Sequence, residues 1–366
     1  MDVLVTGGAG FIGSTVASAA IEAGHRPVIV DNLVTGRREF TRGRCFYEGD
    51  IADAALMHRV LDENPGIKVV IHCAALIVVP DSVARPVDYY RANVAATLSL
   101  VDTLQQRGIR DLVFSSSASI YRADADFTVD EDSALEPQSP YARTKLVVET
   151  MLEDITAAGR LRALSLRYFN PIGADPRLRT GLQVPVPSHA LGKLVEAWSQ
   201  QRPFQVTGTD FETRDGSGIR DYVHVWDLAR AHVAAIERFD RALDGSRHAA
   251  INLGTGRGTT VRELVAAFEE VTGEQVPVTT APRRPGDTAG AYTRSDRAAR
   301  LLGWTAQRDL TEGIADTLAW FAHRPAVLPD LDGLPQRAGR AAYAADTVID
   351  TVIDSLADPV AVGSGR

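Results

Sequence analysis

Two side chains spaced four residues apart, Tyr141 and Lys145, could act together in proton transfer. Ser139 is a candidate N-cap and Pro140 a candidate first helical residue, so the spacing predicts a helix with both side chains on one face. A phenol with a pKa near ~10 is a poor base at neutral pH, but nearby positive charge stabilises its phenolate. Tyr141 could then take a hydroxyl proton.

Lys145 is one of only three lysines in a chain that otherwise uses arginine for its cations, the others being Lys68 and Lys193. A lysine ammonium is a compact donor that can bond ribose hydroxyls and tune a neighbouring phenol, which a planar guanidinium does less well. Tyrosine and lysine at this spacing also occur by chance on exposed helices. The pair therefore needs support from other segments.

Hydroxyl groups cluster after the predicted strand at residues 112–114, in the run Ser115-Ser-Ser-Ala-Ser-Ile-Tyr121. The carboxyl edge of a parallel sheet is where ligands bind in such folds. We expect one of these serine hydroxyls to hold the reacting oxygen. Serines at strand ends are more often caps or turn residues, so spacing alone does not separate Ser117 from Ser115 and Ser116.

A glycine-rich turn, Thr6-Gly-Gly-Ala-Gly-Phe-Ile-Gly13, follows the first predicted strand and precedes a predicted helix over residues 14–23. Such glycines let the backbone turn and approach a pyrophosphate, which the helix N-terminus attracts. Asp31, after the second strand, can accept hydrogen bonds from both ribose hydroxyls and would repel a 2′-phosphate, which favours NAD over NADP. Asp50-Ile51 could hold the adenine amino group or could cap a strand end.

Short Val/Ile/Leu runs alternate with segments of helical length in the amino half, which predicts an α/β fold. We expect a Rossmann-type doubly wound parallel sheet with a smaller, discontinuous α/β substrate domain. The expected boundaries are 1–170 plus 221–252 for an NAD-binding domain, 171–220 plus 253–325 for a nucleotide-sugar-binding domain, and 326–366 for a linker and amphipathic helix of unassigned role.

Charge and composition exclude several classes of protein. The 366 residues are 45% hydrophobic and 23% charged, which excludes wholesale disorder. The net charge of −8 argues against a partner bound through overall positive charge, so we expect neither nucleic acid nor membrane as a partner. Two cysteines, no basic leader and no apolar segment of spanning length indicate a cytoplasmic protein.

An acidic repeat near the carboxyl end, Asp346-Thr-Val-Ile-Asp-Thr-Val-Ile-Asp354, could suggest a metal ligand set. At helical spacing its valines and isoleucines form one stripe and its aspartates another. A solvated acidic face on a docking helix explains this pattern better, so we expect no metal.

Taken together, these motifs resemble the extended short-chain dehydrogenase/reductase superfamily, and within it the UDP-glucose 4-epimerase-like nucleotide-sugar epimerases. The resemblance runs from Met1 to about Pro325. Besides the segments already described, it rests on these motifs: His72-Cys-Ala-Ala75, Asn93, Arg167-Tyr-Phe-Asn-Pro171, Gly218-Ile-Arg-Asp-Tyr222 and Arg283-Arg-Pro-Gly-Asp287.

The resemblance implies a full set of site residues. Those expected to hold NAD are Gly7, Gly10, Phe11, Ile12, Gly13, Asp31, Asn32, Asp50, Ile51, Ala74, Ala75, Asn93, Ser115, Tyr141, Lys145 and Tyr168. Those expected to contact the sugar nucleotide are Ser117, Ser119, Tyr141, Asn170, Arg220, Arg284, Asp287 and Ala291, with the two arginines neutralising the diphosphate. Ser117, Tyr141 and Lys145 are the expected catalytic residues.

The implied reaction is epimerisation at C4 through a transient 4-keto sugar. Tyr141 would remove the C4 hydroxyl proton while hydride passes from C4 to NAD⁺. The 4-keto sugar would then present its opposite face, hydride would return to C4, and Tyr141 would return the proton. Dehydratases and decarboxylases of this superfamily have an acidic residue just after the catalytic hydroxyl, where this chain has Ala118 and Ser119. A nucleotide-sugar 4,6-dehydratase or a net oxidoreductase is therefore disfavoured, and a non-catalytic NAD-binding scaffold is disfavoured by Tyr141 and Lys145.

Several departures leave the substrate open. The lysine often found after the His-x-Ala segment is absent from Leu76-Ile-Val-Val-Pro80, the paired asparagines are replaced by Gln183-Val-Pro-Val, and an aromatic is replaced by Thr207. Ala291 stands where the resemblance puts a residue that limits pocket size, so a 2-acetamido group could fit. The resemblance also implies a homodimer that pairs through helices including that of Tyr141.

Overall fold

The computed structural model describes residues 1–283 and 288–334. Seven parallel strands form its central sheet, in the order β11-β7-β5-β4-β1-β2-β3. Their bounds are β1 Asp2–Thr6, β2 Arg26–Asp31, β3 Cys45–Glu48, β4 Ile67–His72, β5 Asp111–Ser115, β7 Arg162–Tyr168 and β11 His248–Leu253. The order reverses between β1 and β4, and ligands of such sheets bind in the crevice at that reversal.

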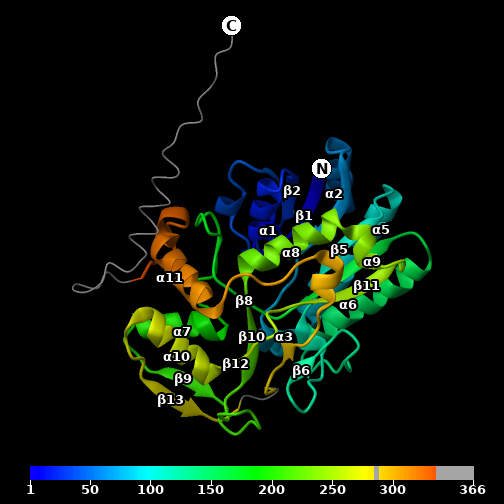
Figure 1. The fold of residues 1–366 in the computed structure, drawn as a ribbon. Helices are drawn as coiled ribbons and strands as arrows, with labels where there is room; N and C mark the ends of the chain where they lie inside the picture. Colours follow the sequence, from blue (N-terminus) through cyan, green and yellow to red (C-terminus); the bar gives the residue numbers. More distant parts are fainter. Residues whose placement is uncertain (284–287, 335–366) are drawn as a thin grey trace.

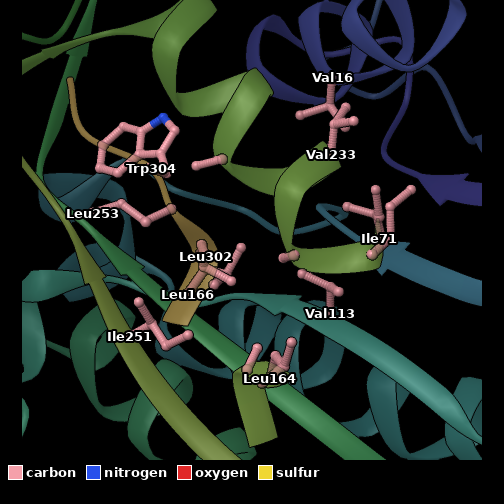
Figure 2. Packing of buried hydrophobic residues seen from close by; sticks show 14 of the residues in the cluster. Val16, Ile71, Val113, Leu164, Leu166, Val233, Ile251, Leu253, Leu302 and Trp304 are labelled. Atoms are coloured by element: carbon pink, nitrogen blue, oxygen red, sulfur yellow. The ribbon is translucent and has the colours of Figure 1, made fainter. Parts of the chain in front are cut away.

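Helices cover both faces of this sheet because its strands are apolar on both sides (Figure 1). On one face, Val3 and Val5 of β1 pack with α1 Phe11–Glu22, α8 Val225–Glu237, α9 Phe239–Leu243 and the short helix η4 Ala298–Leu302. Figure 2 shows this core, with Val16 of α1 beside Val233 of α8. The expectation of a doubly wound parallel sheet is confirmed.

The opposite face carries the helix that bears the candidate catalytic pair. Leu4 of β1 points to this side, where α2 Ala54–Glu63, α5 Ala96–Gln106 and α6 Pro140–Ala157 pack on it. Helix α6 begins as expected, with Ser139 as N-cap accepting a hydrogen bond from Ala142 N and Pro140 as first residue. Helix α1 begins at Phe11, so Gly13 lies inside it rather than before it, and Gly10 is its N-cap.

A second group of elements lies at one end of the sheet and has its own core. It contains two small sheets, β12-β10-β8 and β13-β9, together with α7, α10 and α11 (Figure 1). Their bounds are β8 Asn170–Ile172, α7 Ala190–Ser199, β9 Phe204–Thr207, β10 Ile219–His224, β12 Gly258–Thr260, α10 Val261–Thr272, β13 Val278–Ala281 and α11 Leu310–Val327. The domain boundaries expected from the sequence stay a prediction. Strand β10 pairs with β8 and β12 in this second group, whereas α8 packs on the central sheet and β11 is one of its strands.

The remaining elements are short. They are η1 Arg38–Thr41, α3 Val79–Ala84, α4 Pro86–Tyr89, η2 Tyr90–Ala95, η3 Ala118–Ile120, β6 Thr128–Val129 and β14 Tyr292–Thr293. The acidic repeat at residues 346–354 lies outside the described residues. Among the residues that are described, no helix combines the length and the hydropathy needed to cross a membrane.

Candidate functional site

The glycine-rich turn after β1 forms a cradle in which side chains are sterically excluded. Gly7 has a φ of +70°, and a Cβ there would lie 2.6 Å from Ala74 N. A Cβ on Gly13 would collide with the carbonyl oxygen of Gly7. Gly10 differs, because a Cβ there would meet nothing closer than Gly7 O at 3.4 Å. Its open face lies at the N-terminus of α1, where a pyrophosphate is attracted. Phe11 and Ile12, in the first turn of α1, are half-buried.

Asp31 lies beside this cradle at the end of β2. Its two oxygens accept hydrogen bonds from backbone nitrogens, Oδ2 from Ala9 at 3.0 Å and Oδ1 from Leu33 at 2.8 Å. Burial raises the pKa of Asp31 and these two bonds lower it. A carboxylate has about four lone-pair sites, so acceptor capacity remains for a ribose.

Asn32 and Asp50 are joined at the neighbouring strand ends, because Asn32 Nδ2 donates to Asp50 Oδ2 at 3.1 Å. The other oxygen of Asp50 accepts a hydrogen bond from Ala52 N at 2.8 Å, in a local turn. Asp50 could therefore still either hold the adenine amino group or cap the strand end. Ile51 is buried. These residues share the sheet edge with Asp31 since β2 and β3 are adjacent.

On the other side of β1, the residues after β4 form a second wall. Ala74 and Ala75 are half-buried. Ala74 lies so close to Gly7 that a Cβ on residue 7 would collide with it. Asn93 holds the following loop with its amide: Oδ1 accepts from Leu76 N at 2.8 Å and Nδ2 donates to Leu76 O at 3.0 Å. Nδ2 also donates to Thr144 Oγ1 on α6 at 3.0 Å, which ties this wall to the Tyr141 helix.

The three serines after β5 have different surroundings. Ser115 Oγ lies 3.2 Å from His232 Nε2 and 3.1 Å from Cys73 Sγ. Ser116 Oγ donates to Glu149 Oε1. Ser117 Oγ alone faces Tyr141, with a hydrogen bond that lowers the pKa of that phenol, and it lies 2.9 Å from Ser119 Oγ. The geometry therefore favours Ser117, the serine that the family resemblance implies and that spacing alone does not distinguish.

Tyr141 and Lys145 lie on one face of α6, both buried. Lys145 Nζ donates to Ser115 O at 2.8 Å and lies 5.9 Å from the centre of the Tyr141 ring. Burial lowers the pKa of Lys145 to about 8. Burial raises the pKa of Tyr141, and the Ser117 hydrogen bond opposes this rise.

The sequence predicts that the Lys145 ammonium and a bound nicotinamide cation together lower the pKa of Tyr141, whereas in the protein alone that pKa is raised. The protein's own groups do not lower it because desolvation of the buried phenol outweighs the hydrogen bond that favours its phenolate. A cationic ring close to the phenol would add the missing stabilisation.

Tyr168 ends β7, and Asn170 lies two residues later, at the start of β8 in the second group of elements. Tyr168 is half-buried, its ring lies 6.2 Å from that of His232, and burial raises its pKa well above the usual value. Asn170 begins β8 and pairs in register with Tyr222. Both therefore lie where the central sheet passes into the smaller sheets.

Three of the remaining candidate substrate residues, Ser119, Ala291 and Arg220, are among the described residues. Ser119 is in η3, and Ala291 packs against the cluster that contains Ile120 and Phe169. Arg220 donates through Nη1 to the carbonyl oxygens of Ile219 at 2.7 Å and Ala289 at 2.5 Å. Arg284 and Asp287 lie outside the described residues.

Sequence reasoning assigned no role to four residues that contact this site: Cys73 and Arg167, which lie within the motifs named above, and Glu149 and His232, which do not. His232 donates from Nδ1 to Leu228 O at 2.9 Å, so its Nε2 accepts from Ser115. Burial lowers the pKa of His232 to about 4, which keeps the ring neutral. Glu149 could have been found, because it lies four residues after Lys145, on the same helix face.

This arrangement can carry out proton transfer next to a bound dinucleotide. Tyr141 supplies the proton-transfer group, Ser117 a hydroxyl beside it, and Lys145 a cation; the glycine cradle and Asp31 lie at the same carboxyl edge of the sheet. Among the described residues no group of three or more His, Cys, Asp or Glu side chains is arranged to bind a metal ion.

Comparison with known proteins gives a consistent result. The profile described as "Epimerase: NAD dependent epimerase/dehydratase family" matches residues 3–254. The chain is 45% identical to the UDP-glucose 4-epimerase of Azospirillum brasilense over 321 residues, 87% of this chain and 91% of that protein.

Two solved structures are also similar. The UDP-glucose 4-epimerase of Stenotrophomonas maltophila, with bound NAD and formylated UDP-arabinopyranose, has a TM-score of 0.83 and 40% identity, covering 87% of this chain and 97% of that one. The enzyme of Bifidobacterium longum, in complex with NAD⁺ and UDP, has a TM-score of 0.83 and 35% identity, covering 90% and 100%.

Proposed function

Because the chain belongs to the NAD dependent epimerase/dehydratase family, we propose that it is an isomerase, a nucleotide-sugar 4-epimerase. It holds NAD and interconverts UDP-glucose and UDP-galactose. The observation that carries this proposal is the grouping of Tyr141, Ser117 and Lys145 beside the glycine cradle. The similarity to named UDP-glucose 4-epimerases supports the choice of substrate.

The chain's own residues fit NAD at this site. The cradle excludes a Cβ at Gly7 and Gly13 and leaves the face of Gly10 open, as a pyrophosphate requires. The carboxylate of Asp31 is oriented by two backbone N–H groups and can accept from both ribose hydroxyls. NAD bound there supplies a hydride acceptor and, in the second half of the reaction, a hydride donor.

The protein's part in the reaction is proton transfer at the C4 oxygen. As hydride leaves C4, the Tyr141 phenolate takes the C4 hydroxyl proton, which gives a 4-keto sugar. Ser117 Oγ donates a hydrogen bond to the reacting oxygen, and the Lys145 ammonium stabilises the phenolate. When the sugar presents its other face, hydride returns to C4 and Tyr141 returns the proton.

Epimerisation is favoured over dehydration by the residues that follow Ser117. Ala118 and Ser119 lie in η3, and neither side chain has a carboxylate. The Ser119 hydroxyl forms a hydrogen bond with Ser117. Elimination across C5 and C6 needs a base at C5, and neither of these residues supplies one. The 4-keto sugar is therefore reduced again.

The substrate lies between the central sheet and the smaller sheets. We assign sugar contacts to Ser119 and Asn170 and diphosphate contacts to Arg220. In the segment outside the described residues, we assign Arg284 to the diphosphate and Asp287 to the sugar nucleotide. Ala291 packs beside the Ile120 cluster, and its small side chain favours acceptance of 2-acetamido sugars as well.

We further propose a cytoplasmic homodimer. A groove of about 630 Å³ runs along α5 and α6 and is lined by apolar side chains, among them Leu98, Leu146, Val147 and Met151. Leu98 is 51% exposed and Val147 40% exposed, and exposed apolar side chains that gather in one patch are typical of interaction sites. Substitution of Leu98→Asp is expected to give a monomer by light scattering, and an unchanged mass would contradict this interface.

Free thiols at Cys45 and Cys73 fit the reducing compartment that a cytoplasmic location provides.

The test of the proposed activity is incubation of the purified protein with UDP-glucose and separately with UDP-N-acetylglucosamine, with no NAD added. Anomeric proton signals are followed by NMR. New galacto signals support the epimerase and its retained cofactor. A 4-keto-6-deoxy product would instead indicate a dehydratase, and absence of reaction in a protein that releases NAD on denaturation would favour the scaffold.

A further inference from the structure

A buried carboxylate, Glu149, joins the two segments that carry the proposed catalytic residues, helix α6 and the serine run after β5, to strand β7. It lies on α6, one turn after Lys145, and is 3% exposed. Ser116, next to Ser117, donates to its Oε1. Arg167, next to Tyr168, donates from Nε to both carboxylate oxygens at 3.1 Å and from Nη2 to Oε2 at 2.6 Å.

The guanidinium of Arg167 is held from its other side as well. Nη1 donates to Tyr121 OH at 2.8 Å and to Glu131 O at 3.2 Å. Tyr121 OH donates in turn to Asn252 Oδ1 at 2.7 Å on the edge strand β11. Burial alone would lower the pKa of Arg167, but the bonds and charge of Glu149 raise it above its usual value.

A buried ion pair is poor evidence for stability, because desolvation of both charges offsets their attraction. Apolar residues of similar volume would fill this position at little cost. The pair is therefore better explained by what it orients.

We propose that Glu149 and Arg167 are positioning residues: the pair fixes the serine segment after β5 against the Tyr141–Lys145 face of α6 and supplies the local field around Lys145. This inference rests on the proposed epimerase function. It adds to that function two residues that touch neither cofactor nor sugar.

Of the titratable groups among the described residues that face Lys145, only Glu149 is charged near pH 7. His72 and Cys73, at the end of β4, are both neutral near pH 7, since burial lowers the pKa of His72 to about 3 and raises that of Cys73 to about 11. Tyr141 is a neutral phenol, and Ser115 presents its carbonyl oxygen. Burial has the largest effect on the pKa of Lys145 and lowers it, while the charges of Cys73 and then Glu149 raise it. Near pH 7 only Glu149 of these two is charged, because the pKa of Cys73 is about 11.

The groups that face Glu149 come from several elements. They are Ser116 from β5's end, Arg167 from β7, Tyr121 after η3, and His248 on β11, whose pKa burial lowers and Glu149 raises. Arg167 is the cation among them. Removal of the Glu149 charge should therefore lower the pKa of Lys145, and removal of the Arg167 charge should raise it.

The test uses the scarcity of lysine in this chain. Protein labelled with ¹³C-lysine gives signals from only Lys68, Lys145 and Lys193, so Lys145 can be titrated directly in the NAD-loaded enzyme. Glu149→Gln is expected to move its midpoint to lower pH by roughly half a unit or more. Arg167→Gln is expected to move it to higher pH. Glu153→Gln, an exposed substitution one turn further along α6, is the matched control and should leave it unchanged.

Turnover provides the second readout. Ser116→Ala removes the hydrogen bond to Glu149 without changing any charge, so kcat should fall by about three- to tenfold with KM and the Lys145 midpoint unchanged. If Arg167→Gln does not fold, Glu149→Gln and Ser116→Ala still decide the matter. The inference is overturned if Glu149→Gln leaves the Lys145 midpoint in place, if both charge variants shift it in one direction, or if Ser116→Ala retains full kcat.

Failure of the two proposals is distinguishable. The lysine titration needs no substrate, whereas wild-type turnover of UDP-glucose reports the epimerase function alone. A silent wild type with opposite shifts in the two variants would refute the substrate and keep the positioning role.

Discussion

The ammonium nitrogen of Lys145 lies 5.9 Å from the centre of the Tyr141 ring, one helical turn away on α6. The same nitrogen is fixed by a 2.8 Å bond to Ser115 O, so strand β5 determines where the charge stands relative to the phenol. Proton transfer by Tyr141 thus depends on how this helix packs on this strand.

Replacement of Tyr141→Phe should remove the proton-transfer group and keep the fold, since only a hydroxyl beside Ser117 is lost. We expect kcat to fall by about 10²–10⁴-fold while NAD remains bound. Tyr47→Phe, which alters a surface phenol bonded to Glu63, is the control and should retain full activity. An active Tyr141→Phe protein would indicate a scaffold or another base.

The pH dependence of kcat should report Lys145. Its pKa of about 8 is lowered by burial, so the ammonium is present below that pH and is lost as the pH rises through it. Stabilisation of the phenolate is lost with it, and kcat should decline above about pH 8. Lys145→Arg should abolish this decline, because a guanidinium stays charged, although its different shape should lower the rate. The control is Lys193→Arg, and a wild-type profile that stays flat through about pH 10 would contradict the assignment.

Two glycines of the cradle should respond differently to alanine. Gly13→Ala places a Cβ against the backbone carbonyl of Gly7, so thermal unfolding should show a loss of about 1–3 kcal/mol. Gly10 has an ordinary backbone conformation, with φ −84° and ψ 174°, and a Cβ there would make only ordinary contacts, with Gly7 O at 3.4 Å and Gln183 Nε2 at 4.0 Å. Gly10→Ala should therefore fold normally but retain little NAD after purification. Equal stability of the two variants would contradict this reading of the cradle.

The size of residue 291 should set the preference between plain and 2-acetamido sugars. Ala291 packs beside Ile120 and Phe169, and Ala291→Tyr would place a large side chain there. The ratio of kcat/KM for UDP-N-acetylglucosamine to that for UDP-glucose should fall by at least about tenfold. Ala291→Ser is the conservative comparison. A ratio unchanged by tyrosine would show that another side chain limits the pocket.

The sequence predicted the central sheet well because its strands are continuous apolar runs and its helices have local signals. The N-cap at Ser139 with Pro140 is one such signal, and the structure has it. The start of α1 was placed three residues late, since Gly13 was taken as part of the turn. Its close approach to Gly7 O is a tertiary contact that residue spacing does not reveal.

The candidate site was predicted in its residues more than in its electrostatics. Tyr141 and Lys145 follow from spacing, but the rise in the pKa of Tyr141 depends on burial beneath the strand ends. The partners of the serines come from α6 and α8, far away in sequence, so only the fold separates Ser117 from Ser115 and Ser116. Glu149 and Arg167, 18 positions apart, meet for the same reason.

The most direct test of the account follows the hydrogen at C4. UDP-glucose carrying deuterium at C4 is incubated in ordinary water with the protein and no added cofactor, and the UDP-galactose formed is analysed by NMR and mass spectrometry. Hydride removed and returned within one site must leave the deuterium at C4 of the product. Galacto product that carries protium at C4 would show exchange with solvent and would contradict the mechanism.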